Sequence, residues 1–348
     1  MKWQVLRGYL FSAMVLAVIV ALLTVQTLKP WRSATALSSR PWPITPPGKV
    51  AIGVTTVSLA RDSFRPWRLS DLREVNEFEQ DARLHADIVM WFSDWAHGTF
   101  DAAQARAIVK RGSIPEICWE PWDYRIGIRH RQPKYTLESI IDGHHDAYIR
   151  RFANAVRRYG GPLRLRFAQE MNGNWYPWSE TQNGNSRGQF VLAWRHVHAI
   201  FAAVGATNVT WVWSPVAGDI RRSEYPGRSE VDVLGLSGFN GGTILYGDRW
   251  RSFTGIFGRS LRAIHALAPG KPVEVSEVAS TETGGHKAAW IRAMFDQVRR
   301  RPYIRALIWF NLRKETDWRI ESSPFAQAAF AEGAASLHDA SGLRGSSG

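Results

Sequence analysis

The stretch LRLRFAQEMNGNWYPW, residues 163–178, joins a short apolar run to a loop crowded with amide and aromatic side chains. The first six residues are typical of a buried strand, and one carboxylate, Glu170, follows almost directly. A carboxylate at the end of a buried strand is either a surface charge or part of a site. The organisation of the rest of the chain distinguishes the two.

Eight such runs, rich in β-branched and aromatic residues, recur along the sequence. They are KVAIGV (49–54), ADIVMWF (86–92), SIPEICW (113–119), LRLRFA (163–168), VTWVWS (209–214), VDVLGLSG (231–238), PVEVSEV (272–278) and IRALIWF (304–310). Amphipathic helical patterns separate them, as at 145–160, 189–205 and 286–300. Apolar strands alternating with helices predict a parallel sheet covered by helices, and eight such units predict a (β/α)8 TIM barrel. A doubly wound open sheet is the alternative, but no glycine-rich phosphate loop follows the first run.

The beginning of the chain has a different composition. Lys2 and Arg7 precede an uncharged apolar run of 21 residues at 8–28. A helix of that length spans a hydrocarbon core of about 30 Å. The ATA sequence at 34–36 resembles a signal-peptidase site. Residues 1–28 are therefore predicted to be a retained membrane anchor or a cleaved signal, with a buried core helix as a third reading. Basic residues lie on both sides of the run and do not fix its orientation, and we expect an extracytoplasmic protein, membrane-anchored or secreted.

The remaining segments follow from composition. Residues 29–48 contain five prolines and no acidic residue, which predicts an extended linker. Residues 49–333 form one predicted domain, and residues 334–348 are predicted to be a disordered tail.

The net charge of +13 invites a nucleic-acid reading. However, the basic residues are scattered over predicted helices among apolar positions, which is typical of solvated helix faces, so no nucleic-acid partner is expected. The single cysteine, Cys118, excludes an internal disulfide framework and offers no zinc-site spacing. We expect a monomer without a metal or organic cofactor.

Active sites of such barrels lie at the carboxyl ends of the strands. Two carboxylates stand out there, Glu170 after the fourth run and Glu277 in the seventh, 107 residues apart. Cleavage of a glycosidic bond needs one protonated and one ionised carboxyl group across a cleft. Strand alternation places Arg166 on the same face as Glu170, where its guanidinium would keep the partner carboxylate charged.

Aromatic side chains add weight to a sugar site. Seventeen tryptophans are present, and nine lie near predicted strand ends: Trp91, Trp95, Trp119, Trp122, Trp175, Trp178, Trp211, Trp213 and Trp309. Indole faces stack on sugar rings, and about half of the nine are expected to line a cleft. Other chemistries are less well supported, because Ser214 and Ser237 lack a nucleophile elbow and the histidines lack metal spacing.

The motif RFAQEMNGNWYPW resembles the acid/base motif of glycoside hydrolase family 26, a group of retaining (β/α)8 glycosidases that includes β-mannanases, mixed-linkage glucanases and β-1,3-xylanases. The blocks DAYIRRFANAVRRYGGPLRLRF, VTWVWSP, YPGRSEVDVLGLSGFN, KPVEVSEVASTETGGHKAAWI and IWFNLRKETDWRIESSP extend the resemblance over most of residues 50–330. It implies that Glu170 is the acid/base and Glu277 the nucleophile. The implied or expected substrate-binding residues are Arg166, Gln169, Asn172, Trp175, Trp178, Trp119, Trp213, Phe239 and Trp309.

Three positions depart from the usual pattern of that family. Gln169 stands where histidine is common, Phe239 where a tyrosine often hydrogen-bonds the nucleophile, and Val216 where asparagine is frequent. Both glutamates of the implied catalytic pair are present, so the main hypothesis is a retaining endo-β-glycosidase acting on a β-mannan or β-glucan. The alternative is a catalytically weak, membrane-tethered glycan-binding protein that assists polysaccharide export or remodelling.

Overall fold

A computed structural model describes residues 49–60, 67–245 and 249–339 of the chain. The predicted anchor or signal at 1–28 and the predicted linker at 29–48 lie outside the described residues. Within the described part, no helix combines the length and apolar character needed to cross a membrane.

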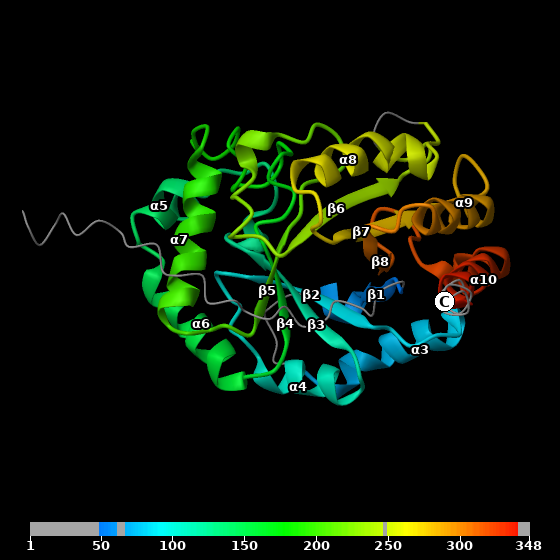
Figure 1. The fold of residues 1–348 in the computed structure, drawn as a ribbon, viewed down its shortest axis with the longest axis horizontal. Coiled ribbons are helices and arrows are strands. Elements are labelled where there is room, and N and C mark those ends of the chain that lie inside the picture. Colours follow the sequence, from blue (N-terminus) through cyan, green and yellow to red (C-terminus); the bar gives the residue numbers. More distant parts are fainter. Residues whose placement is uncertain (1–48, 61–66, 246–248, 340–348) are drawn as a thin grey trace, which may run out of the picture. The chain divides into compact units, whose positions relative to one another are not determined.

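Eight parallel strands close into a barrel and follow one another around it in sequence order (Figure 1). They are β1 (Ala51–Thr56), β2 (Ile88–Asp94), β3 (Ile114–Glu120), β4 (Leu163–Phe167), β5 (Val209–Trp213), β6 (Val233–Asn240), β7 (Val273–Ser280) and β8 (Ile304–Asn311). All eight predicted runs are strands, with ends within two residues of prediction. The pairing of β1 with β8 closes the sheet, so the barrel is confirmed and the open sheet is wrong.

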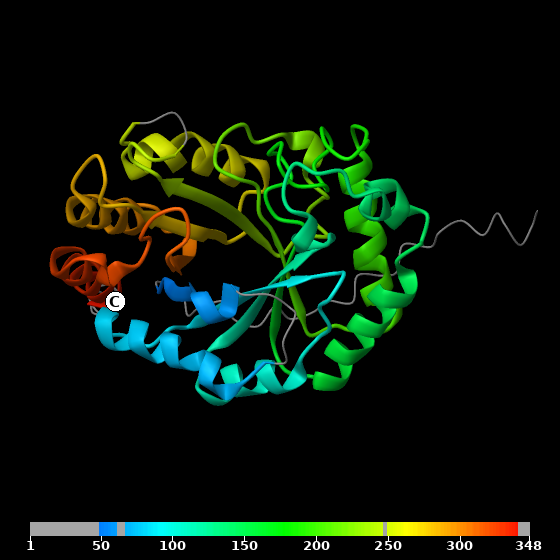
Figure 2. The same cartoon turned by 180° about the vertical axis from the view of Figure 1, so that it is seen from behind.

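Helices surround the strands, as Figures 1 and 2 show from opposite sides. They are α2 (Val57–Ala60), α3 (Arg73–Ala82), α4 (Ala102–Lys110), α5 (Leu137–Ile141), α6 (Asp146–Tyr159), α7 (Gln189–Ala203), α8 (Phe253–Leu267), α9 (Lys287–Arg299) and α10 (Pro324–Asp339). Short 3-10 helices lie at Leu69–Leu72, Tyr124–Ile126, Pro133–Tyr135, Arg222–Glu224 and Ile320–Ser322.

Local sequence explains where several of these helices begin and end. The Asp101 carboxylate accepts hydrogen bonds from the Ala103 and Gln104 amides at the start of α4. The Ser252 hydroxyl accepts one from the Gly255 amide at the start of α8. Helix α6 ends at Gly160, whose φ of 70° is the left-handed conformation that glycine adopts without strain.

Strand alternation divides the interior into two cores. The apolar cluster inside the barrel is small and consists of Ala51, Ile88, Met90, Cys118, Ala306 and Ile308. Beside it the buried guanidinium of Arg164 pairs with the buried carboxylates of Glu116 and Glu274. The larger aromatic core fills the space between the strands and the helices. The barrel interior is thus unusually polar. Pairing of its charges offsets the free-energy cost of burying them.

The predicted tail boundary at residue 334 is wrong. Helix α10 continues to Asp339, and Ala334 and Leu337 are buried against the rest of the domain. Two apolar residues at helical spacing extend the packed face beyond the predicted end of the domain. Residues 340–348 lie outside the described residues.

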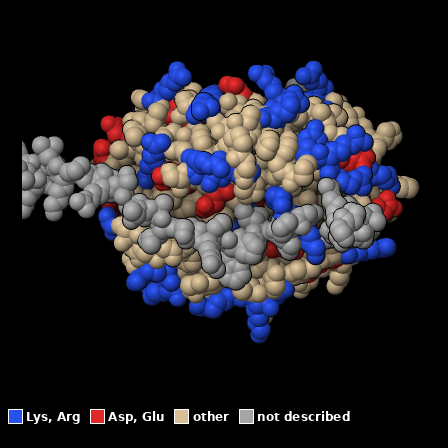
Figure 3. Space-filling model, in the orientation of Figure 1, with Lys and Arg blue, Asp and Glu red and all other residues tan. Residues whose placement is uncertain are grey.

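Basic side chains lie in several separate groups on the face that Figure 3 shows, with acidic side chains between them. This distribution agrees with scattered, solvated charges.

Candidate active site

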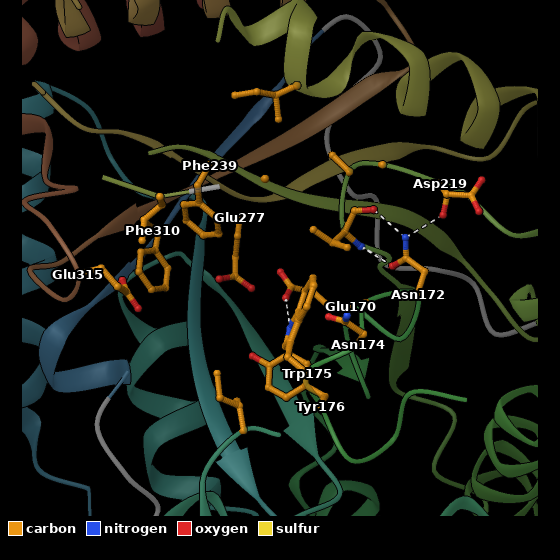
Figure 4. Close-up of a pocket in the computed structure, with 18 of the residues that line it drawn as sticks. Glu170, Asn172, Asn174, Trp175, Tyr176, Asp219, Phe239, Glu277, Phe310 and Glu315 are labelled. Carbon is orange, nitrogen blue, oxygen red and sulfur yellow. Dashed lines mark hydrogen bonds between the residues drawn. The ribbon is translucent and has the colours of Figure 1, made fainter. Parts of the chain in front are cut away.

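A cavity of about 640 Å³ opens where the strands end, and both Glu170 and Glu277 line it. Glu170 follows β4, and Glu277 lies on β7. Figure 4 shows the two carboxylates turned toward each other across the cavity. The structure thus brings together the two carboxylates that the sequence singled out.

The turn that carries Glu170 is held in an unusual conformation. Ala168 and Glu170 have φ angles of 48° and 56°, in the left-handed region that residues with a Cβ rarely adopt. Each left-handed residue costs roughly 1–2 kcal/mol. Backbone hydrogen bonds resist relaxation, because the Ala168 amide donates to Trp119 O at 3.0 Å and the Glu170 amide donates to Ser214 O at 2.8 Å. The turn is therefore fixed to the ends of β3 and β5.

Trp175 reaches Glu170 because glycine stands at 173. A Cβ at Gly173 would come within 2.6 Å of the Trp175 ring, so only glycine lets the indole lie against the chain there. In that position Trp175 Nε1 donates to Glu170 Oε2 at 3.1 Å. The half-buried indole also lines the cavity.

Glu277 reaches the cavity through an irregularity in β7. The pairing of β6 with β7 shifts by one residue between Leu236 and Ser237, so that Ser237 pairs with Glu277. Such a bulge turns a side chain that strict alternation would direct to the other face. Arg166, which is completely buried, donates to Glu277 Oε1 and to Ser237 Oγ. The sequence-based expectation that Arg166 supports the partner of Glu170 agrees with this contact.

The two carboxyl groups have different electrostatic environments. Burial raises the pKa of Glu170 to about 7, and the negative charge of Glu277 acts in the same direction. The positive charge of Arg166 and hydrogen bonds from Ser237 and Trp175 oppose this rise. Arg166 forms a direct ion pair with Glu277. Glu170 can therefore hold a proton near neutral pH, whereas Glu277 is paired with a buried cation.

Of the other predicted binding residues, Phe239 lines the cavity and packs on Phe310 and Trp318. Asn172 also borders the cavity, but its amide is committed to the chain. Asn172 Nδ2 donates to Val216 O and Asp219 O, and Asn172 Oδ1 accepts from the Val216 amide. It fixes the loop after β5 rather than presenting a free amide to a ligand.

Four tryptophans that were expected to bind substrate lie away from the cavity and are fully buried: Trp119, Trp178, Trp213 and Trp309. Trp119 stacks on Phe152, and Trp309 packs on Phe330 of α10. Strand alternation explains both cases, because the inward neighbours Cys118 and Ile308 place Trp119 and Trp309 on the helix side. These four tryptophans are packing residues of the core.

Other residues reach the site without having been predicted. Phe310, Trp318 and Tyr176 line the cavity with Phe239 and Trp175. Alternation along β8 could have identified Phe310 in place of Trp309. Trp318 and Tyr176 lie in loops, where no periodicity predicts direction.

A second cavity of about 310 Å³ shares Ile128, Tyr176, Phe310 and Lys314 with the first. Asp94 and Glu120, at the ends of β2 and β3, line it together with Trp122. Of the nine tryptophans near strand ends, Trp175 therefore lines the first cavity and Trp122 the second.

Asp94, His97 and Asp123 form a cluster with ligand atoms within 4.8 Å of one another, among the described residues. His97 Nδ1 lies 2.7 Å from Asp94 Oδ2 and 3.9 Å from Asp123 Oδ1. A histidine–carboxylate hydrogen bond accounts for the short contact, and we assign no metal to the cluster.

The hydrogen bond from Trp175 gives a testable effect on acidity. Trp175→Phe removes a donor that stabilises ionised Glu170, so the pKa of Glu170 should rise, and an NMR titration of its carboxyl carbon should have its midpoint at higher pH. Trp318→Phe is a matched control, because its indole donates to Glu315 instead. The prediction fails if the titration midpoint of Glu170 in Trp175→Phe stays in place or moves to lower pH.

Comparison with known proteins adds independent information. The sequence model of glycosyl hydrolase family 26 matches residues 84–307. Endoglucanase H of Acetivibrio thermocellus is 35% identical over 94% of this chain, and a mannan endo-1,4-beta-mannosidase of Bacillus subtilis is 26% identical over 37%. The chain spans 33% and 41% of the lengths of these two relatives.

Solved structures agree at the level of the fold. A family 26 β-mannanase from Bacteroides ovatus has a TM-score of 0.60 at 14% identity, with 83% of this chain and 89% of that one covered. A modular endo-β-1,4-mannanase from Cellulomonas fimi has a TM-score of 0.60 at 17% identity, covering 82% and 70%. With the family match extending from the end of α3 into β8, this chain belongs to glycoside hydrolase family 26.

Proposed function

We propose that the protein is a retaining endo-β-glycosidase that cleaves a β-linked polysaccharide by double displacement, with Glu170 as acid/base and Glu277 as nucleophile. The observation that carries the proposal is the unequal pair in one cavity. A carboxyl group with a pKa of about 7 faces a carboxylate held by a buried arginine.

In the first step, an oxygen of Glu277 attacks the anomeric carbon while Glu170 gives its proton to the glycosidic oxygen. The bond from the anomeric carbon to the leaving sugar breaks, and an ester to Glu277 forms. Arg166 binds Oε1 of Glu277, which leaves Oε2 for the attack.

In the second step, Glu170 removes a proton from water as the water oxygen attacks the anomeric carbon. The ester bond breaks, Glu277 is again a carboxylate, and Glu170 is again protonated. Two inversions give net retention at the anomeric carbon. Carboxyl groups and water suffice for both steps, so the mechanism requires no metal or organic cofactor.

The cavity and the relatives support the proposed substrate class. Trp175, Phe239 and Trp318 offer aromatic surface for sugar rings. We propose a β-glucan or β-mannan, and we place β-glucan first because the endoglucanase relative matches along nearly the whole chain. We also propose that the enzyme acts outside the cytoplasm, tethered or released according to the fate of residues 1–28, and as a monomer.

Release of reducing ends from a panel of soluble polysaccharides tests the proposal. The panel contains mixed-linkage β-glucan, carboxymethylcellulose, glucomannan, galactomannan and β-1,3-xylan. Hydrolysis of at least one β-glucan or β-mannan by the wild type is expected. Binding without hydrolysis of any of the five would instead support a glycan-binding protein.

The pKa of Glu170 sets the expected pH dependence. Because Glu170 must be protonated for the first step, kcat/KM should fall above about pH 7, approaching about tenfold per pH unit. Initial rates between pH 5 and pH 9 measure this limb. A rate that stays constant to pH 9 would rule out Glu170 as the acid with this pKa.

A further inference from the structure

The strained turn that carries Glu170 has one more attachment, through the side chain of Gln169. Gln169 lies between Ala168 and Glu170, the two residues with left-handed backbone conformations. Its side chain is almost completely buried, and Gln169 Nε2 donates to Glu120 Oε1 at 2.6 Å. Its backbone carbonyl oxygen accepts a hydrogen bond from Trp178 Nε1 at 2.7 Å. Gln169 is thus held from both its side chain and its backbone.

Glu120, which accepts the hydrogen bond from the Gln169 side chain, is held in place by its own surroundings. It is the last residue of β3, it is buried, and its other oxygen, Oε2, accepts from Trp122 Nε1 at 3.2 Å. Asp94 is its register partner on β2. No salt bridge from a lysine or arginine to Glu120 is found among the described residues. Ion pairing with a lysine or arginine therefore does not explain why a carboxyl group is buried at this position.

We propose that Glu120 is a positioning residue for Glu170, because its carboxyl group holds Gln169 and Gln169 holds the turn that directs Glu170 into the cavity. This inference rests on the proposed function. Left-handed residues at 168 and 170 persist only when their surroundings hold them, and Glu120 supplies the side-chain contact that does so from β3.

The electrostatic environment fits a neutral Glu120. Burial raises the pKa of Glu120 to about 8; the hydrogen bonds from Gln169 and Trp122 oppose the rise, and the charges of Asp94 and Glu277 add to it. Other ionisable groups near Glu120 are Tyr176, Cys118 and, at the rim of the second cavity, Lys314. Glutamine is neutral and keeps a carbonyl oxygen that can accept the hydrogen bond from Gln169. Glu120→Gln is therefore the matched conservative variant.

The test uses the chemistry of the leaving group. Glu120→Ala and Gln169→Ala should each lower kcat/KM on polysaccharide by about tenfold to 10²-fold, as displacement of a catalytic group does. With a 2,4-dinitrophenyl glycoside, whose leaving group needs no proton, kcat/KM should stay within about twofold of the wild type. Glu120→Gln should retain the wild-type rate on polysaccharide within about threefold, because it keeps an acceptor for Gln169.

Two further results decide the inference. The double variant Glu120→Ala/Gln169→Ala should lose no more activity than the worse single variant, because both changes remove one contact. Equal losses on both substrates, or multiplying losses in the double variant, would overturn the positioning role. Melting temperatures of all variants separate these outcomes from unfolding. If the wild type hydrolyses no polysaccharide and no aryl glycoside, the proposed function fails. If the wild type is active but the variants lose equal activity on both substrates, only the positioning role of Glu120 fails.

Discussion

Replacing Glu277 by glutamine is expected to lower kcat by about 10⁵-fold to 10⁶-fold, the range seen when a catalytic nucleophile is removed. An amide oxygen is too weak a nucleophile to form the glycosyl–enzyme ester, yet it still accepts a hydrogen bond from Arg166. Reducing-end release from the preferred polysaccharide measures the loss.

Two controls interpret that result. Glu332→Ala, on the exposed side of α10, should leave the rate unchanged, because Glu332 only pairs with Arg292 at the surface. Glu277→Ala should be equally inactive but less stable by about 3–5 kcal/mol, since it leaves the buried Arg166 charge without its carboxylate. A Glu277→Gln enzyme within tenfold of the wild type would exclude Glu277 as nucleophile.

Replacing Glu170 by alanine is expected to lower kcat/KM on polysaccharide by about 10²-fold to 10⁴-fold, the usual contribution of general acid catalysis. The loss should nearly disappear in kcat/KM for a 2,4-dinitrophenyl glycoside, because that leaving group departs without a proton. The second step still lacks its base, so kcat on the aryl glycoside should remain low.

Azide provides the diagnostic for Glu170. It attacks the glycosyl–enzyme without needing a base, so added azide should restore kcat of Glu170→Ala and give a β-glycosyl azide. Product analysis by NMR identifies the anomer. Losses of equal size on both substrates, without rescue by azide, would contradict an acid/base role.

The fold was largely predictable because its signals are local and repeated. Each strand is a short run rich in apolar residues, since its two faces meet the barrel interior and the surrounding helices. The predicted boundary ends before the last turns of α10 because it left out Ala334 and Leu337, two apolar residues that pack at helical spacing.

The site was predictable where strand alternation held and unpredictable where it did not. Arg166 follows alternation, and its contact with Glu277 agrees with expectation. Glu277 reaches the cavity through a shift in register between β6 and β7, which no pattern in the sequence reveals. The family resemblance implied Trp309, whereas alternation along β8 directs Phe310 to the cavity.

Glu120 shows a different limit. It directly follows the third apolar run, a strand end where site residues are expected, but the sequence does not show what its side chain contacts. Its importance arises from a 2.6 Å contact with Gln169, 49 residues away, and from burial beside Asp94. Contacts between residues on separate strands depend on the register of a closed barrel, which one sequence does not specify.

Trapping of the covalent intermediate tests the assignment of the catalytic pair most directly. A 2-deoxy-2-fluoro glycoside with a good leaving group slows both steps, the second more severely, so the glycosyl–enzyme accumulates. Mass spectrometry of peptides should find one fluorosugar attached to Glu277, with no label in the Glu277→Gln enzyme. Label on another residue, or release of a product with inverted configuration and no label, would contradict a retaining enzyme with Glu277 as nucleophile.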